Sequence, residues 1–256
     1  MSTIPRLLKL KDYITLIGTT LGLISLVSAC IGTRDAISFG FFLISISIGT
    51  DLIDGYIARK TGTVNEMGRE LDSLSDCLTF GISPAILTFQ VFSSKTGNPY
   101  DLFLLIGCIL FALGAMLRLA RFNIAMDTGY TGVPTPASAL LIIAYFYANY
   151  FYTLAMGGIG IPFLEVAYYA TPFFMILMGW FNITIHITFG EKGKYLYVIF
   201  ILFAPLCPIF GIIGIFNPNF IVSIVVALFF IISFFSLVGY IFLRLFLNLF
   251  KKKKTS

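Results

Sequence analysis

Four aspartates interrupt two otherwise apolar segments of the chain, at spacings that group them in pairs. Asp51 and Asp54 are three residues apart, and Asp72 and Asp76 are four residues apart. On an α-helix, the first pair is separated by about 60° around the axis and ~4.5 Å along it, and the second pair by about 40° and ~6 Å. Each helix therefore presents two carboxylates along one stripe.

These two stripes have the composition of a metal site. A short loop joins the segments as antiparallel neighbours, so the stripes can face each other. Four carboxylates this close repel one another unless cations lie among them. Oxygen ligands suit Mg²⁺ or Mn²⁺, and two ions held by shared carboxylates form a clamp for phosphoryl groups. A single aspartate is more simply a helix cap or an ion-pair partner, but two pairs at helical spacing favour two divalent ions.

Small residues and a cation accompany the acids. Gly55 and Ala58 follow the first pair, and Gly68 lies one turn before the second pair. A helix surface without bulky side chains lets a ligand approach the backbone closely. Arg59 is positioned to pair with phosphate oxygens. The segment therefore predicts a pocket for a phosphate-bearing ligand.

The composition defines the elements that must hold these residues. Of 256 residues, 58% are hydrophobic and 11% are charged, whereas a soluble domain carries about 25% charged residues. The mean hydropathy is +0.96. A soluble protein is excluded, and we expect an all-α integral membrane protein with a single membrane domain over residues 1–256. Apolar runs long enough to span the bilayer predict about eight helices, at 13–32, 36–57, 71–93, 101–121, 136–156, 166–184, 195–215 and 220–248.

Basic residues set the expected orientation. Of the 17 Lys and Arg residues, only Arg34 and Lys95 fall in the loops expected outside, which is a strong positive-inside asymmetry. Both termini and the acidic cluster are therefore expected on the cytoplasmic side. The abundance of Ile, Lys and Phe hints at an AT-rich microbial genome, so we expect the cell membrane of a prokaryote.

Both ends of the chain are basic. Residues 1–12 are expected to form an interfacial segment, with a short helix over 4–11 lying on the membrane surface. Residues 250–256 form a basic cytoplasmic tail that suits anionic headgroups. The net charge of +5 is therefore explained by membrane lipids, and no nucleic-acid partner is indicated.

The acidic segment also resembles a family motif. Written out, it reads Asp51-x2-Asp54-Gly55-x2-Ala58-Arg59-x8-Gly68-x3-Asp72-x3-Asp76. This pattern resembles the motif of the CDP-alcohol phosphotransferases at every fixed position and spacing. The resemblance implies that Asp51, Asp54 and Asp72 ligate two metal ions, with Asp76 also near one of them. It implies a CDP-lipid pocket formed by Asp51, Gly55, Ala58, Arg59, Gly68 and Asp72.

The resemblance further implies a chemical role for Asp76. As general base, Asp76 would take the proton of an acceptor hydroxyl, whose oxygen attacks the β-phosphorus while CMP leaves. A carboxylate that is bound to a metal ion is a weaker base, whereas the same ion acidifies a bound hydroxyl. We therefore expect the metal and Asp76 to share the task. The resemblance also implies a homodimer.

Two further stretches indicate the acceptor. Residues 72–85, with Phe80-Gly81 and Pro84-Ala85, resemble the phosphatidylserine synthase version of this helix. Residues 118–123, followed by 132–137, resemble a second hallmark of that subgroup, which includes archaetidylserine synthases. The resemblance implies L-serine as the acceptor and a CDP-activated lipid, either CDP-diacylglycerol or CDP-archaeol, as the donor.

A pair of arginines is the independent physical signal in the second stretch. Arg118 and Arg121 are three residues apart at the inner end of the fourth span, so they share a helix face. Together with Asn123, they are predicted to hold an anion, either the lipid diphosphate or the serine carboxylate. Anchoring of the helix at the cytoplasmic interface is the structural alternative.

Two other functions remain open at this stage. An enzyme of the same family with a phosphorylated acceptor, such as glycerol 3-phosphate or inositol phosphate, would need additional cationic groups near the site. A cation transporter would use the acidic cluster as an ion pathway. Transporters usually carry their acids near the bilayer midplane within repeated halves, whereas these acids cluster toward one face and no repeat is visible.

Overall fold

The structure, a computed structural model, is a bundle of membrane-spanning helices. It describes residues 8–61, 66–124, 130–189 and 219–253, together with positions 209, 212 and 216. Within these residues, seven helical segments are long and apolar enough to cross a membrane. The elements are α2 (Leu10–Ile31), α3 (Arg34–Thr61), α4 (Glu66–Asp76), η1 (Cys77–Ile82), α5 (Ser83–Phe92), α6 (Pro99–Ile124), β1 (Tyr130–Thr131), α7 (Thr135–Ala155), α8 (Glu165–Ile183), β2 (Thr188–Phe189) and α10 (Phe220–Lys253).

The membrane-spanning architecture predicted from composition is confirmed. Seven of the eight predicted spans correspond to these helices, with ends that differ by a few residues. The eighth, 195–215, lies outside the described residues, as does most of the predicted surface helix at 4–11. The end of that N-terminal segment differs from the expectation, because Lys11 and Asp12 are buried in the first turn of α2. The predicted tail at 250–256 begins as the last turn of α10, which ends at Lys253.

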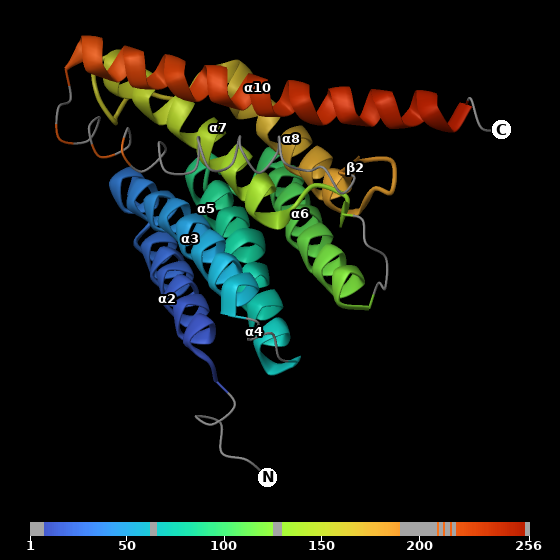
Figure 1. The fold of residues 1–256 in the computed structure, drawn as a ribbon. Helices are drawn as coiled ribbons and strands as arrows, with labels where there is room; N and C mark the ends of the chain where they lie inside the picture. Colours follow the sequence, from blue (N-terminus) through green and yellow to red (C-terminus); the bar gives the residue numbers. More distant parts are fainter. Residues whose placement is uncertain are drawn as a thin grey trace.

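Helix α7 forms the centre of the bundle. It is the most deeply buried of the seven spans, and it carries the fully buried aromatic side chains of Phe146, Tyr147 and Phe151. The Tyr147 hydroxyl donates to the Ser38 carbonyl of α3 at 2.9 Å. Figure 1 shows α2, α3 and α4 on one side of α7 and the long helix α10 lying across it on the other. A polar contact of this kind is stabilised in a core that has little water to compete for it.

Helices α6 and α8 pack backbone against backbone. A Cβ atom built on Gly114 would lie 2.5 Å from the Gly179 carbonyl oxygen, and one on Gly179 would lie 2.7 Å from the Leu110 carbonyl oxygen. No side chain fits in either place. Small residues permit such close approach of membrane helices, where packing replaces the hydrophobic effect as the attraction between them.

The third span is not a uniform α-helix. Between α4 and α5, residues Cys77–Ile82 form a π-helical segment, which lies directly after Asp76. π-Helical turns are rare and occur often at functional sites. Here the segment contributes Thr79 and Phe80 to the wall of the acidic pocket. The apolar run at 71–93 predicted a single membrane-spanning helix through this point.

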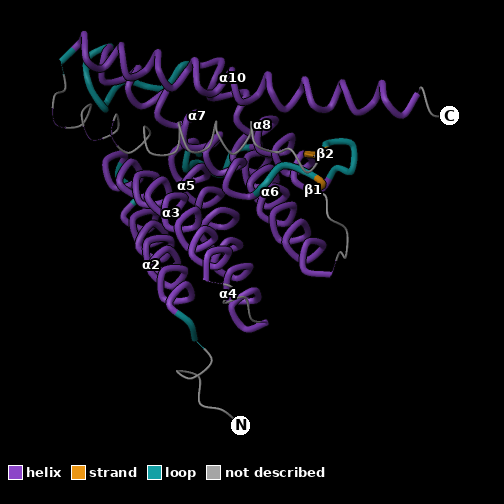
Figure 2. Tube along the Cα trace, viewed as in Figure 1, coloured by secondary structure: helices purple, strands orange, loops and turns teal. Residues whose placement is uncertain are grey.

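A small antiparallel sheet fixes the chain before α7. Strands β1 and β2 pair Tyr130 with Phe189 and Thr131 with Thr188, as Figure 2 shows in orange. Gly132 follows β1 with φ +80°, and its Cβ would lie 2.1 Å from the Asn182 carbonyl oxygen. Only glycine fits this left-handed, crowded position. The sheet and Gly132 thereby set where α7 begins.

Candidate metal and phosphoryl-transfer site

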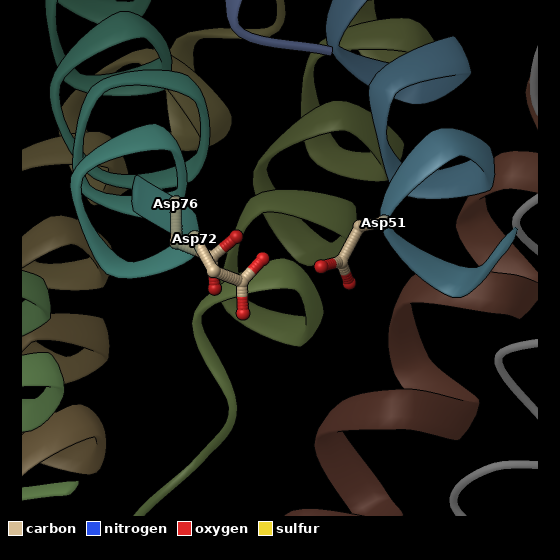
Figure 3. A group of neighbouring side chains, drawn as sticks. All are labelled: Asp51, Asp72 and Asp76. Carbon is tan, nitrogen blue, oxygen red and sulfur yellow. The ribbon is translucent and has the colours of Figure 1, made fainter. Parts of the chain in front are cut away.

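Helices α3 and α4 bring the predicted carboxylates together. One carboxylate oxygen from each of Asp51, Asp72 and Asp76 lies within 4.8 Å of the others. Figure 3 shows Asp72 and Asp76 side by side on one helix, with Asp51 facing them from the other. The three side chains are half-buried. The two carboxylate stripes predicted from the helical spacings therefore face each other and form a convergent acidic site.

The fourth aspartate, Asp54, lies on α3 one turn after Asp51, and its carboxylate is bonded to a residue of a third helix, α2. Asp54 is 6% exposed, and its Oδ2 accepts a hydrogen bond of 2.7 Å from the buried hydroxyl of Thr15 on α2. A buried carboxylate without a partner would be costly. Helix α2 thus contributes to the site by fixing the orientation of Asp54.

A pocket connects these residues. Its lining combines the four aspartates with several hydroxyl groups and one aromatic ring. The lining residues are Thr15, Gly18, Ser47, Thr50, Asp51, Asp54, Asp72, Ser75, Asp76, Thr79 and Phe80.

The donor set fits a hard divalent cation. The site offers carboxylate oxygens from Asp51, Asp72 and Asp76 at mutual distances that one ion can bridge. All are hard oxygen donors, and no His or Cys belongs to the group among the described residues. Mg²⁺ and Mn²⁺ prefer such ligands. The cluster is therefore suited to hold a divalent metal.

A buried ion pair adjoins the cluster. The Lys11 ammonium lies 2.9 Å from Asp12 Oδ1, and their side chains are 8% and 0% exposed. Both groups act electrostatically on Asp72, and Lys11 also acts on Asp54. The first turn of α2 thus brings a cation to the edge of the acidic site. The sequence had indicated only an interfacial segment here.

Of the two predicted arginines, Arg118 reaches the acidic site. Its side chain is 7% exposed, and its Nη1 donates to Thr135 Oγ1 at 3.4 Å. The Thr135 hydroxyl donates in turn to Asp76 Oδ2 at 3.3 Å. Arg118 is also among the charged groups that act electrostatically on Asp76. A buried cation is therefore coupled to the proposed base through one hydroxyl.

Arg121 makes different contacts. Its Nη1 donates to the Ile183 carbonyl at 2.7 Å, and its Nη2 donates to the Thr131 carbonyl at 3.0 Å. The guanidinium therefore joins the ends of α6 and α8 to strand β1. Such contacts with backbone carbonyls favour a structural role, and binding of an anion by Arg121 stays a prediction.

Asn123 links α6 to α4. Its Oδ1 accepts a hydrogen bond of 3.0 Å from Ser73, and its Nδ2 donates to Glu70 Oε2 at 3.2 Å. Ser73 directly follows Asp72 in the chain. Asn123 thus supports the helix that carries the second pair of aspartates, and its predicted contact with a substrate anion stays a prediction.

The remaining residues of the predicted CDP-lipid pocket flank this site. Gly55 follows Asp54 on α3, and Gly68 is buried on α4. Helix α3 continues through Ala58 and Arg59, whose side chains lie outside the described residues. Their predicted contacts with the CDP group stay predictions.

Several residues at or beside the site were not predicted from the sequence. Thr15 and Lys11 come from the first span, and Thr135 comes from the fifth. Thr135 lies between two prolines in the stretch 132–137, which the sequence marked only through its family resemblance. The signal in the sequence that could have identified Thr135 is its position as a polar residue at the start of an apolar span.

Fold and site together define a polytopic membrane protein with a carboxylate-rich site that is suited to hold a divalent metal. Residues 8–169 match the model of the CDP-alcohol phosphatidyltransferase family. The matched residues include α2 to α7 and the whole acidic cluster. The chain belongs to this family.

Curated relatives from archaea and bacteria are similar to the chain. The CDP-diacylglycerol–serine O-phosphatidyltransferase of Methanocaldococcus jannaschii is 39% identical over 145 residues, which cover 57% of this chain and 64% of that protein. The archaetidylserine synthase of Methanothermobacter thermautotrophicus is 31% identical over 150 residues, covering 57% and 61%. The CDP-diacylglycerol–serine O-phosphatidyltransferase of Bacillus subtilis is 35% identical over 128 residues, covering 48% and 69%. The chain thus spans just under two thirds of the length of the first two.

Proposed function

We propose that this protein transfers the phosphatidyl or archaetidyl group of a CDP-activated lipid to the hydroxyl of L-serine and releases CMP. The observation that carries the proposal is the convergence of Asp51, Asp72 and Asp76 within 4.8 Å, in a chain that belongs to the CDP-alcohol phosphatidyltransferase family. The names of the relatives support serine as the acceptor.

Two divalent ions, Mg²⁺ or Mn²⁺, complete the proposed site. Asp51, Asp54, Asp72 and Asp76 would hold them, and Thr15 would keep the Asp54 carboxylate oriented through its 2.7 Å hydrogen bond. When bound, such ions neutralise the diphosphate and acidify a bound hydroxyl. This chemistry requires oxygen donors on two facing helices, which α3 and α4 supply.

The proposed reaction is a displacement at the lipid-side phosphorus. The serine hydroxyl oxygen forms a bond to the β-phosphorus, and the bond from that phosphorus to the bridging oxygen breaks. The bridging oxygen leaves with CMP, which is a good leaving group as a phosphate dianion. Asp76 takes the proton of the serine hydroxyl as the new bond forms. Phosphorus, oxygen and the proton are thereby all accounted for.

Arg118 is the proposed partner of the serine carboxylate. A carboxylate lies two carbon atoms from the hydroxyl in serine, so a group that binds it must lie near the base. Arg118 meets this requirement through its coupling to Asp76 by way of Thr135. Guanidinium groups bind carboxylates with strong charge-assisted hydrogen bonds. For the serine ammonium, Glu66 and Glu70 are candidates by position, and both are exposed at the start of α4.

The membrane environment, the orientation and the oligomeric state are further parts of the proposal. The positive-inside pattern supports a site that opens to the cytoplasm, with membrane lipids around the helices, and the abundance of Ile, Lys and Phe is the basis for proposing a prokaryotic cell membrane. The homodimer implied by the family resemblance is part of the proposal. The family match at residues 8–169 supports one membrane domain that includes the site.

An acceptor screen tests the proposal. Purified protein in detergent is given CDP-diacylglycerol, Mn²⁺ and one of L-serine, glycerol 3-phosphate, inositol phosphate or water, and CMP release is measured. We expect release with L-serine, its loss with EDTA and its recovery when Mg²⁺ or Mn²⁺ is restored. The Asp51→Asn and Asp72→Asn variants should lose at least about 100-fold. Release with glycerol 3-phosphate but not with serine would overturn the acceptor.

A matched control uses the same helix. Asp35 lies in the first turn of α3, at the far end from Asp51, and its carboxylate accepts a hydrogen bond from Tyr150. The Asp35→Asn variant keeps an acceptor there and should retain activity. Ion flux through liposomes without CMP release would instead support the transporter.

A further inference from the structure

The Thr135 hydroxyl joins two charged groups of the site, Arg118 and Asp76. Thr135 is fully buried, and its Oγ1 lies 3.4 Å from Arg118 Nη1 and 3.3 Å from Asp76 Oδ2. A guanidinium can only donate hydrogen bonds. The Thr135 oxygen must therefore accept from Arg118, which directs its single proton toward Asp76.

The backbone around Thr135 is held rigidly. Gly132 N–H donates to the Ile187 carbonyl at 2.8 Å, and Val133 N–H donates to the Phe181 carbonyl at 3.0 Å. Pro134 and Pro136 flank Thr135 and restrict φ on both sides. Because Gly132 fits its crowded position only as glycine, the whole turn delivers one hydroxyl to a defined place.

Asp76 lies where the third span changes from an α-helix to a π-helical segment. It is the last residue of α4, and the π-helical segment begins immediately after it. An aspartate carboxylate can rotate about two side-chain bonds, whereas the backbone before Thr135 is held by the hydrogen bonds of Gly132 and Val133. The hydrogen bond from Thr135 occupies one lone pair of Oδ2 and leaves the other carboxylate oxygen for a ligand or for the acceptor proton.

We propose that Thr135 is a positioning residue, which orients the Asp76 carboxylate for proton transfer and transmits the placement of Arg118 to it. This inference rests on the proposed function and refines it, because it assigns a role to the stretch 132–137 that resemblance alone had marked. Residues that orient a functional carboxylate typically contribute about 10-fold to 100-fold in activity or metal affinity.

The test compares two replacements of Thr135. Thr135→Val keeps the shape and removes the hydroxyl, whereas Thr135→Ser keeps the hydroxyl. We expect kcat for CMP release to fall about 10-fold or more in Thr135→Val, with KM for the CDP-lipid within about twofold, and to recover substantially in Thr135→Ser. Mn²⁺ binding, followed by electron paramagnetic resonance, should weaken in Thr135→Val and recover in Thr135→Ser.

Thr153→Val is the matched control. Thr153 lies on the same helix, is fully buried, and donates its hydroxyl to the Tyr150 carbonyl at 2.7 Å, far from the aspartates. The Thr153→Val variant should leave kcat and Mn²⁺ binding unchanged. Its change in the temperature of thermal unfolding in detergent measures how much the loss of one buried hydroxyl destabilises the protein. A Thr135→Val protein as active as the wild type would overturn the proposal. So would a Thr135→Ser protein as impaired as Thr135→Val, because packing of the methyl group would then be the cause.

The proposed function and the positioning role of Thr135 would be overturned by different results. If the wild type releases CMP with an acceptor other than serine, the proposed function is wrong in its acceptor, and the same comparison of variants is made with that acceptor. The positioning role of Thr135 is overturned only by the relative activities and Mn²⁺ affinities of Thr135→Val, Thr135→Ser and the wild type. Mn²⁺ binding supplies this comparison even without turnover.

Discussion

Thr15 on α2 donates a 2.7 Å hydrogen bond to Asp54 on α3, and both residues are buried. The bond joins the first span to the acidic site and fixes one of its carboxylates. We predict that Thr15→Val lowers activity about 10-fold or more and weakens Mn²⁺ binding, while Thr15→Ser preserves both. Thr20→Val serves as the control, since Thr20 is exposed on the same helix and donates its hydroxyl to the Leu16 carbonyl. Equal activity of the two valine variants would contradict the role of Thr15.

The α6–α8 contact predicts a stability effect. A methyl group on Gly114 would lie 2.5 Å from the Gly179 carbonyl oxygen, so Gly114→Ala should destabilise the protein by about 1–3 kcal/mol. Gly239→Ala on α10 meets no atom within 4 Å, and alanine favours the helix there. Thermal unfolding in detergent should show a lower Tm for the first variant and an unchanged or higher one for the second. A Tm for Gly114→Ala equal to that of the wild type would show that the helices are not in this contact.

Arg118 predicts selectivity for an acceptor that carries a carboxylate. In Arg118→Gln, we expect KM for L-serine to rise at least about 10-fold, because a charge-assisted hydrogen bond contributes about 1.5–3 kcal/mol. Ethanolamine has the hydroxyl and the ammonium but no carboxylate, so CMP release with ethanolamine as the acceptor should change much less. Steady-state CMP release with both acceptors measures this. An equal loss for both acceptors would assign Arg118 to the diphosphate or to Asp76 alone.

Replacement of Arg121 is predicted to change the stability of the protein and not its KM for serine. The Arg121 guanidinium joins α6 to the Ile183 and Thr131 carbonyls, and lysine cannot make both contacts in the same geometry. Arg121→Lys should therefore lower stability by about 1–2 kcal/mol, with KM for serine near that of the wild type. An elevated KM with unchanged thermal unfolding would restore the anion-binding role predicted from the sequence.

The acidic cluster was predictable because its information is local. Asp51 and Asp54, like Asp72 and Asp76, are related by helical spacing alone, and one loop brings the two helices together. The spans follow in the same way from the length of the apolar runs. The spacing of residues along the chain and the thickness of the bilayer are therefore nearly sufficient to predict these features.

The polar partners of the cluster could not be predicted in this way. Which face of α2 or α7 meets Asp54 or Asp76 depends on how separate helices pack, and periodicity in a uniformly apolar helix does not show it. Arg121 illustrates the same limit, because its partner at residue 183 is distant in the sequence. The π-helical segment at Cys77–Ile82 is a local departure from regular geometry that the apolar pattern does not encode.

The central claim is that the serine hydroxyl oxygen attacks the lipid-side phosphorus of a CDP-lipid at the aspartate cluster. The most direct measurement uses L-serine labelled with ¹⁸O in its hydroxyl group, together with CDP-diacylglycerol and Mn²⁺, and follows the label by mass spectrometry. The account predicts the label in the phosphodiester of a phosphatidylserine product, unlabelled CMP, and neither product from Asp76→Asn at a comparable rate. A lipid product without the label, labelled CMP, or full activity of Asp76→Asn would contradict it.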